Sequence, residues 1–199
     1  MQHNDTKKVF LLPNLQYKNY SLRAVYYRVK NPAYFITGYD SALGKYRMIR
    51  QNLSSEEGAV FTLSLPYQHK NFTSSNYIAA NINRVNDPHA SGLKTKPFYH
   101  LYSNNQLTLP RNYTFTFIGW FTTKKYEVIF ERNQQFAVDL SLTKTFKKGL
   151  SITLNAFDIF RSLDHKEAFT VNGIYSSTVY YENVREFSIA IKYSIGKIS

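Results

Sequence analysis

The feature that most constrains this fold is an alternation of apolar and small polar side chains that recurs along the chain. In residues 136–143 the apolar members are Phe136, Val138, Leu140 and Leu142, and the positions between them are Ala137, Asp139, Ser141 and Thr143. The same pattern returns in residues 150–156 and 187–195, and less cleanly in residues 113–121. Successive side chains of an extended chain point to opposite faces of a sheet. The sequence therefore predicts β-strands with one oily face and one polar face.

The lengths of these segments and of their connections favour a membrane barrel over a soluble sheet. Strands in soluble sheets usually have about five or six residues, whereas about ten tilted residues span the apolar core of a bilayer. Short connections are expected at residues 18–19, 68–71, 110–112 and 147–149, and long polar ones at residues 30–57, 84–96, 124–134 and 161–183. Alternation of short and long connections is typical of outer-membrane barrels, which have tight periplasmic turns and long extracellular loops.

The pattern predicts an all-β fold, an antiparallel up-and-down transmembrane β-barrel segment of about nine strands. The expected strands are residues 10–17, 20–29, 58–67, 72–84, 98–109, 113–123, 135–146, 150–159 and 184–196, with a separate hairpin inside residues 34–49. Single-chain bacterial barrels have even strand numbers. We therefore expect residues 1–199 to be one barrel domain and the C-terminal fragment of a larger barrel, with no plug domain and no signal peptide. The other strands of that barrel would precede Met1 or come from elsewhere.

The composition removes several kinds of site and leaves the partner open. The chain has no cysteine, which excludes disulfides, thiolate zinc sites and a cysteine nucleophile. A net charge of +12 suits nucleic acid, anionic lipid or lipopolysaccharide phosphate. The basic residues of the long connections are Lys45, Arg47, Arg50, Lys94, Lys96, Lys124, Lys125, Arg132, Arg161 and Lys166. Two interpretations stay open: these residues meet lipopolysaccharide phosphates or an acidic ligand, or they only keep the loops soluble.

The residue pattern argues against catalysis and against metal binding. The histidines are His3, His69, His89, His100 and His165, which fall on different segments without paired spacing. Zinc needs several ligands brought together, so solvated or lumen histidines are the better interpretation. We expect Asp139 to be a hydrated lumen residue and Asp158 a rim residue, not a carboxylate pair for acid–base chemistry. We find no phosphate loop or hydrolase motif and predict no enzyme, no cofactor and no catalytic residue.

The aromatic residues are expected to gather near the two ends of the strands. Near the short turns are Tyr17, Tyr20, Tyr67, Tyr113, Phe146 and Tyr193, and nearer the long loops are Tyr99, Phe121, Phe160 and Phe187. In a membrane barrel such rings form girdles at the level of the lipid headgroups. The alternative is that tyrosine-rich strands simply pack in a soluble sheet.

Four stretches carry a resemblance to a known family. They are YSNNQLTLP at residues 102–110, VDLSLTKTF at 138–146, LNAFDIF at 154–160 and REFSIAIKYSIG at 185–196. In their order and spacing they resemble the outer-membrane β-barrel family of Bacteroidetes, the C-terminal barrel of TonB-dependent-receptor-like proteins, over residues 10–196. The resemblance implies a barrel of roughly 22 strands, as in plugged transporters, of which this chain supplies the final third to half.

The function that this resemblance implies is uptake or recognition of a bulky nutrient, such as a siderophore, glycan or peptide, in the bacterial outer membrane. TonB would act through the missing plug, and the other partners would be the missing strands, outer-membrane lipid and lipopolysaccharide. Recognition is expected on the long loops and on polar-face residues Asp139, Ser141, Thr143, Ser151, Thr153 and Asn155. Two alternatives remain: a self-contained small pore or adhesin, and a soluble basic β-sheet that binds single-stranded nucleic acid.

Overall fold

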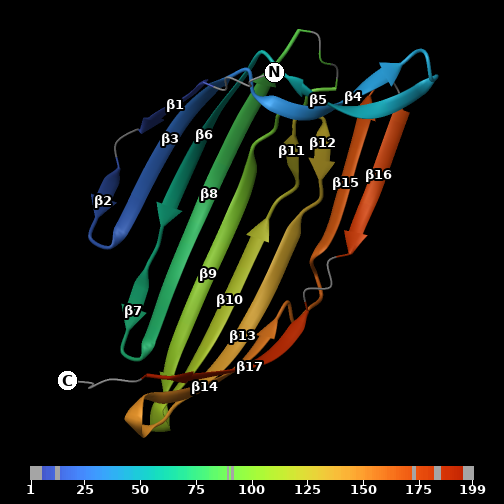
Figure 1. Ribbon diagram of the computed structural model, residues 1–199. Helices are drawn as coiled ribbons and strands as arrows, with labels where there is room; N and C mark the ends of the chain where they lie inside the picture. The colour runs from blue at the N-terminus through green and yellow to red at the C-terminus, as the bar shows by residue number, and fades with distance from the viewer. Residues whose placement is uncertain are drawn as a thin grey trace.

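A computed structural model shows a curved wall of long antiparallel strands (Figure 1), and the structure describes residues 6–11, 14–88, 90, 92–171, 174–181 and 185–194. The wall contains β1 (Thr6–Leu11), β2 (Leu15–Tyr17), β3 (Tyr20–Lys30), β6 (Ser55–Ser64), β7 (Tyr67–His69), β8 (Phe72–Asn86), β9 (Phe98–Leu109), β10 (Tyr113–Thr122), β13 (Gln135–Thr145), β14 (Leu150–Phe157) and β17 (Glu186–Tyr193). Over the described ranges these eleven strands form one sheet in the order β1-β3-β6-β8-β9-β10-β13-β14-β17, with β2 beside β3 and β7 beside β8.

The expected strands of the wall are confirmed. Expected segment 10–17 overlaps β1 and β2, and segment 58–67 overlaps β6 and β7, which are separated at Leu65 and Pro66. Proline has no backbone N–H for a sheet ladder. The side chain of Asn76 donates a hydrogen bond to the carbonyl oxygen of Leu65 at 3.1 Å. That bond satisfies a backbone group beside the proline, so the sheet continues past it.

The short turns lie at one end of the wall, which we call the turn end. Lys18, Lys70 and Arg111 have φ between 50° and 62° there, a left-handed conformation that tight turns require. Gly149 has φ +79°, and a Cβ on it would lie 3.0 Å from the carbonyl oxygen of Ser194. The expected short connections at 18–19, 68–71, 110–112 and 147–149 are confirmed.

The two faces of the wall differ as the alternation predicts. Phe115 lies opposite Leu107 on β9 and Leu142 on β13, so the apolar positions share one face, the oily face. On β17 the oily residues Phe187, Ile189 and Ile191 are 68–70% exposed. The opposite, polar face holds Asp139, Ser141 and Thr143 of β13. An oily face left this exposed is stable only against an apolar surrounding such as lipid.

The wall is open along its edges. In the part of the chain that the structure describes, β1 and β17 stand at the two ends of the strand order and do not pair with each other. An open set of up-and-down strands is a barrel segment, as expected. Across the same described ranges no helix is long and apolar enough to cross a bilayer.

The long connections lie at the other end, the loop end, and contain more strands than the sequence predicts. The hairpin expected inside residues 34–49 is confirmed as β4 (Ala33–Asp40) and β5 (Lys45–Asn52). The expected long connections at 124–134 and 161–183 are present between wall strands, but they contain strands that the sequence does not predict: β11 (Lys125–Glu127), β12 (Phe130–Arg132), β15 (Asp164–Val171) and β16 (Ile174–Tyr181). In the described residues these four strands form a second sheet in the order β11-β12-β15-β16. The pairing of β12 with β15 joins segments far apart in the sequence, which no local pattern predicts.

Candidate recognition surface

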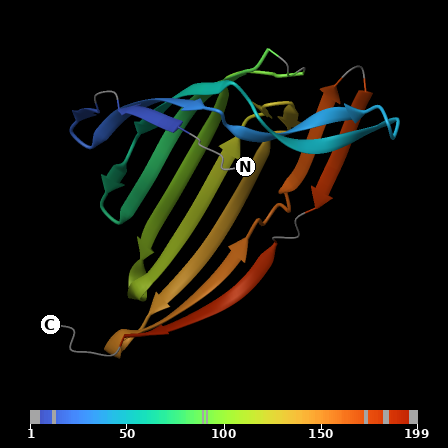
Figure 2. The same ribbon diagram turned by 45° about the horizontal axis from the view of Figure 1, so that its top comes forward.

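A small apolar core sits at the loop end, outside the wall. Its buried members are Ile36, Leu53, Val85, Val128 and Ile129, with Tyr34, Ile49, Ala90, Leu93, Phe130 and Phe169 packed against them. The hairpin β4–β5 reaches from the β3–β6 side of the wall towards β15 and β16, as both ribbon views show (Figures 1 and 2). The N–H of Lys94 donates to the carbonyl oxygen of Val128 at 2.9 Å. The core and this hydrogen bond join the four long connections, residues 30–57, 84–96, 124–134 and 161–183, into one layer, which we call the loop-end layer.

A buried carboxylate ties this layer to the wall. Glu56, on the polar face of β6, is 8% exposed and accepts hydrogen bonds from the hydroxyls of Tyr27 (3.0 Å) and Tyr34 (2.5 Å). Tyr27 belongs to β3 and Tyr34 to the hairpin, so one carboxylate holds two elements. Burial raises the pKa of Tyr34 well above its usual value, and the hydrogen bond to Glu56 raises it further.

Charged side chains link the strands of the second sheet. Arg132 donates to Glu167 at 2.8 Å and to Glu127 at 2.5 Å, joining β11, β12 and β15. Lys125 lies 4.0 Å from Glu127. A guanidinium can satisfy two carboxylates at once because its donors are held in a fixed planar fork. The expected basic residues Lys125 and Arg132 therefore stabilise the layer through ion pairs.

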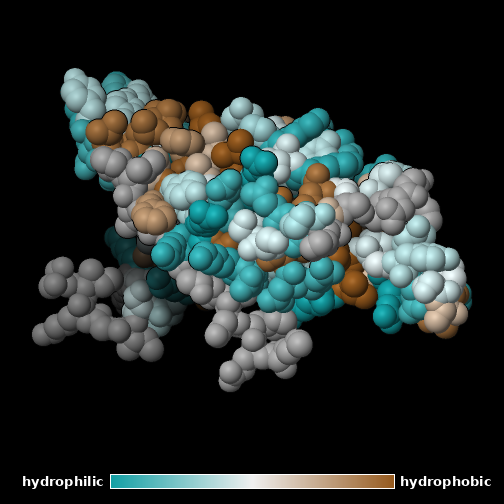
Figure 3. Space-filling view, turned by 90° about the horizontal axis from the view of Figure 1, so that it is seen from above, coloured by the Kyte–Doolittle hydropathy of each residue, from teal (hydrophilic) through white to brown (hydrophobic). Residues whose placement is uncertain are grey.

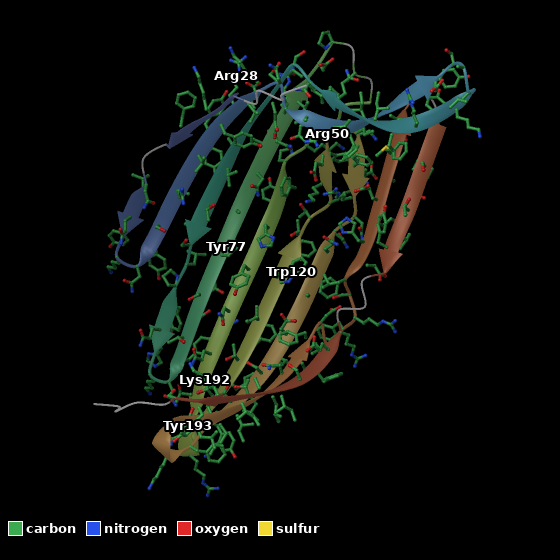
Figure 4. The ribbon with its side chains drawn as sticks, viewed as in Figure 1. Arg28, Arg50, Tyr77, Trp120, Lys192 and Tyr193 are labelled. Carbon is green, nitrogen blue, oxygen red and sulfur yellow. The ribbon has the colours of Figure 1, made fainter. Side chains whose placement is uncertain are left out.

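The polar face carries a row of rings that we call the aromatic row: Tyr77, His100, Tyr102 and Trp120. Figure 4 labels two of them, Tyr77 on β8 and Trp120 on β10, near the middle of the wall. Tyr77, Tyr102 and Trp120 lie in register across β8, β9 and β10, and the rings of Tyr77 and Tyr102 stack at 5.0 Å. His100 lies within hydrogen-bonding distance of the Tyr77 hydroxyl (3.1 Å) and of Thr122 (2.7 Å). The sequence interpretation missed this row, although each member is an aromatic residue at a polar-face position of its strand.

The polar residues expected on the inner wall share one face, as predicted. Thr143 and Thr153 contact each other through their hydroxyls at 2.9 Å, and Asn155 donates to Ser188 at 3.3 Å. Asp158, expected at the rim, is 2% exposed. Its carboxylate accepts bonds from the N–H and hydroxyl of Ser162, both at 2.9 Å, so it shapes the connection after β14.

The remaining candidate residues are spread over the molecule. His3 and His89 lie outside the described residues, His69 lies at the turn end on β7, and His165 contacts Gln135 at 2.9 Å. Among the residues with described positions, no group of three or more His, Cys, Asp or Glu is arranged to hold a metal ion. On the oily face, Tyr17, Tyr20, Tyr67 and Tyr193 are exposed at the turn end and Tyr99 and Phe136 at the loop end.

The oily face also has a hollow of about 470 Å³ that the sequence interpretation missed. It lies around Gly119, between side chains such as Ile78, Leu101 and Phe136. Beside it, Ser103 donates to Asn76 at 2.6 Å and Ser74 donates to Asn105 at 2.7 Å. These small polar residues satisfy one another, which removes the cost of placing unpaired polar groups on an apolar face.

The surface seen from the loop end is mainly hydrophilic, with smaller groups of hydrophobic side chains (Figure 3). A hydrophilic end above an oily band is the arrangement that a barrel needs to stand in a membrane.

Comparison with known proteins agrees with this geometry. A sequence model described as "Outer membrane protein beta-barrel family" matches residues 10–193. Searches of curated proteins and of solved structures give no significant match. The match covers nearly all of the wall and of the loop-end layer. The chain therefore belongs to the outer membrane protein beta-barrel family, and its place is the bacterial outer membrane.

Proposed function

We propose that this chain is part of a TonB-dependent-receptor-like transporter that takes up a bulky nutrient, such as a siderophore, glycan or peptide, and that it performs no catalysis. The observation that supports this most is the aromatic row, which lies on the face that lines the lumen of a closed barrel. Aromatic rings beside polar groups recognise ligands that have both flat apolar surfaces and hydrogen-bonding groups.

The loop-end layer supports the same proposal. Large ligands need an entrance that selects among them, and loops held by a rigid scaffold commonly provide such recognition. Here the connections share a core around Leu53 and Ile129, each 1% exposed. The layer is thus a structured surface above the lumen face and not a set of independent loops.

Two neighbouring aromatic residues with opposite orientations make a sharp test. Trp120 belongs to the polar face and Phe121 to the oily face of β10. Uptake of labelled oligosaccharides, oligopeptides and ferric siderophores is measured in the producing bacterium with Trp120→Ala or Phe121→Ala in the full gene product. We expect Trp120→Ala to reduce uptake of one of these probes by tenfold or more at equal surface abundance, and Phe121→Ala to preserve it.

Energy coupling is tested in the same cells. Removing TonB, or collapsing the proton gradient, is expected to abolish accumulation of that probe while leaving its binding to the cell surface intact. Accumulation that persists without TonB would contradict the transporter proposal and would favour a passive pore. Loss of uptake in both alanine variants would contradict the role given to the aromatic row.

A further inference from the structure

A cluster of lysines surrounds a depression on the second sheet. The depression, of about 320 Å³, is lined by Lys124, Glu131, Asn133, Gln134, Lys166, Ala168 and Tyr175. The ammonium groups of Lys94, Lys96 and Lys124 lie 5.4–5.7 Å from the ring centroid of Tyr126. We call this group of side chains the lysine pocket.

The charges of the lysine pocket do not balance. Glu131 is 2.5 Å from the ammonium of Lys124 and 3.8 Å from that of Lys94, so one carboxylate serves two lysines. Lys96 and Lys166 have no ion pair with any other residue whose position is described. Four lysines against one carboxylate leave the lysine pocket strongly positive. Phosphate groups are suited to it, since lysine is a common phosphate ligand.

The strand register places the lysine pocket on the outside of the barrel. Lys125 lies 6.0 Å from the ring of Phe98, and Phe98 belongs to the polar face. His165 contacts Gln135, which also belongs to the polar face. The side chains of Lys125 and His165 therefore lie on the lumen side of the second sheet.

The neighbouring positions point the other way, because side chains alternate along a strand. Tyr126 follows Lys125 and lies in register with Glu131, while Lys166 follows His165. Glu131 is also in register with Ala168, two residues from Lys166. These side chains of the lysine pocket therefore lie on the same side of the wall as the oily face, beyond its loop-end edge.

The height of the lysine pocket corresponds to the lipid headgroups. Phe121 and Phe136 lie opposite each other at the loop-end edge of the oily face. Lys124 is three residues beyond Phe121, and Asn133 is three residues before Phe136. The exposed rings of Tyr99 and Phe136 lie at that edge. Aromatic rings at such an edge stand at headgroup level, and lysines directly above them meet whatever charge the headgroups carry.

From this placement we propose that the lysine pocket binds the phosphate groups of a membrane lipid in the outer leaflet, such as the lipid part of lipopolysaccharide. Acyl chains would lie on the oily face below while the phosphates contact Lys96, Lys124 and Lys166. The proposal rests on the outer-membrane location and not on the transport function, so either can fail without the other.

The test compares lipid binding to the purified full chain in detergent, with EDTA present to remove divalent cations. The probes are lipid A with two phosphate groups, the same lipid without phosphate, and inorganic phosphate alone. The variant Lys96→Gln/Lys166→Gln is compared with Lys45→Gln/Arg50→Gln, which removes the same charge from the β4–β5 hairpin. Retained lipid is measured by native mass spectrometry, and folding by circular dichroism.

We expect the unchanged chain to retain the phosphorylated lipid at least tenfold better than the dephosphorylated lipid. The Lys96→Gln/Lys166→Gln variant is expected to lose most of that preference, and the hairpin variant to keep it. Equal retention of both lipids, or an unchanged preference in the pocket variant, would overturn the proposal. Saturation by inorganic phosphate at the same concentration as the lipid would assign the lysine pocket to a soluble anion instead.

Discussion

The carboxylate of Asp139 accepts a hydrogen bond from the backbone N–H of Asp158 at 2.8 Å. Asp139 lies on the wall strand β13, and Asp158 follows the end of β14 with φ 42°, in the left-handed region. The Asp158 carboxylate in turn accepts bonds from the N–H groups of Ser162 and Leu163. The two aspartates lie close together, as the carboxylates of an acid–base pair would. Their oxygens, however, accept hydrogen bonds from backbone N–H groups and from the Ser162 hydroxyl, and these bonds position the connection that follows β14.

Replacing Asp139 tests this relationship. Asp139→Ala leaves the Asp158 N–H without its acceptor, which costs about 1–3 kcal/mol where the group is buried. We expect faster hydrogen exchange of the amides in residues 158–163, measured by mass spectrometry in detergent, with little change in β8 and β9. Asp139→Asn, which retains an oxygen acceptor, is the matched control and should exchange like the unchanged chain. Equal protection in all three proteins would contradict this role for Asp139.

Gly58 leaves room for the tyrosine that binds Glu56. A Cβ at Gly58 would lie 2.6 Å from the Tyr27 ring, so Gly58→Ala should displace Tyr27 and weaken its bond to Glu56. We expect a loss of about 1–3 kcal/mol, the range for overpacking, measured by urea unfolding in detergent. Gly119→Ala is the control, because its Cβ would meet nothing nearer than 3.5 Å. In a Tyr27→Ala background the clash is absent, so adding Gly58→Ala there should cost little. An equal cost of Gly58→Ala in both backgrounds would contradict the explanation.

Ile129 holds the loop-end layer together. It is 1% exposed in the turn between β11 and β12, and truncation of such a side chain costs about 2–5 kcal/mol. We expect Ile129→Ala to increase proteolytic cleavage in residues 33–52 and 125–132 while the wall stays resistant. Leu43→Ala, at a position 66% exposed, should cleave like the unchanged chain. A pattern of cleavage shared by both variants would show that the layer has no common core.

The pair Lys124–Glu131 predicts a pH effect at the loop end. A hydrogen bond from Lys124 lowers the pKa of Glu131 below its usual 4.5. Because the pKa of Glu131 is lower in the folded state, the pair stabilises the fold at pH values above the unfolded-state pKa of Glu131. This stabilisation is lost as the pH falls through the folded-state pKa. We expect Lys124→Gln to return the Glu131 pKa towards 4.5, as measured by NMR titration of its carboxyl carbon. The stability change should be small because Lys124 is exposed and Glu131 is only partly buried.

Lys45→Gln serves as the control for that titration, since Lys45 lies on the β4–β5 hairpin. It should leave the Glu131 pKa where it is. If both lysine variants shift the Glu131 pKa equally, the effect comes from the overall charge and not from the pair.

The wall and its two faces follow from the sequence alone. Alternation of side chains is a local property, so the run from Phe136 to Thr143 suffices to place Asp139 opposite the oily face. The turns at Lys18 and Gly149 and the separation of aromatic residues towards the strand ends are local for the same reason. These features predict a membrane barrel segment before any pairing is known.

Only the tertiary structure decides which residues come together at the loop end. The core around Leu53 and Ile129 and the pairing of β12 with β15 each join residues from separate connections. The bond between Asp139 and Asp158 joins a wall strand to the connection after β14. The aromatic row likewise exists because β8, β9 and β10 lie in one register. Periodicity says which face a side chain occupies, but it carries no information about which distant residue stands beside it. That depends on strand register and on the packing of connections against one another.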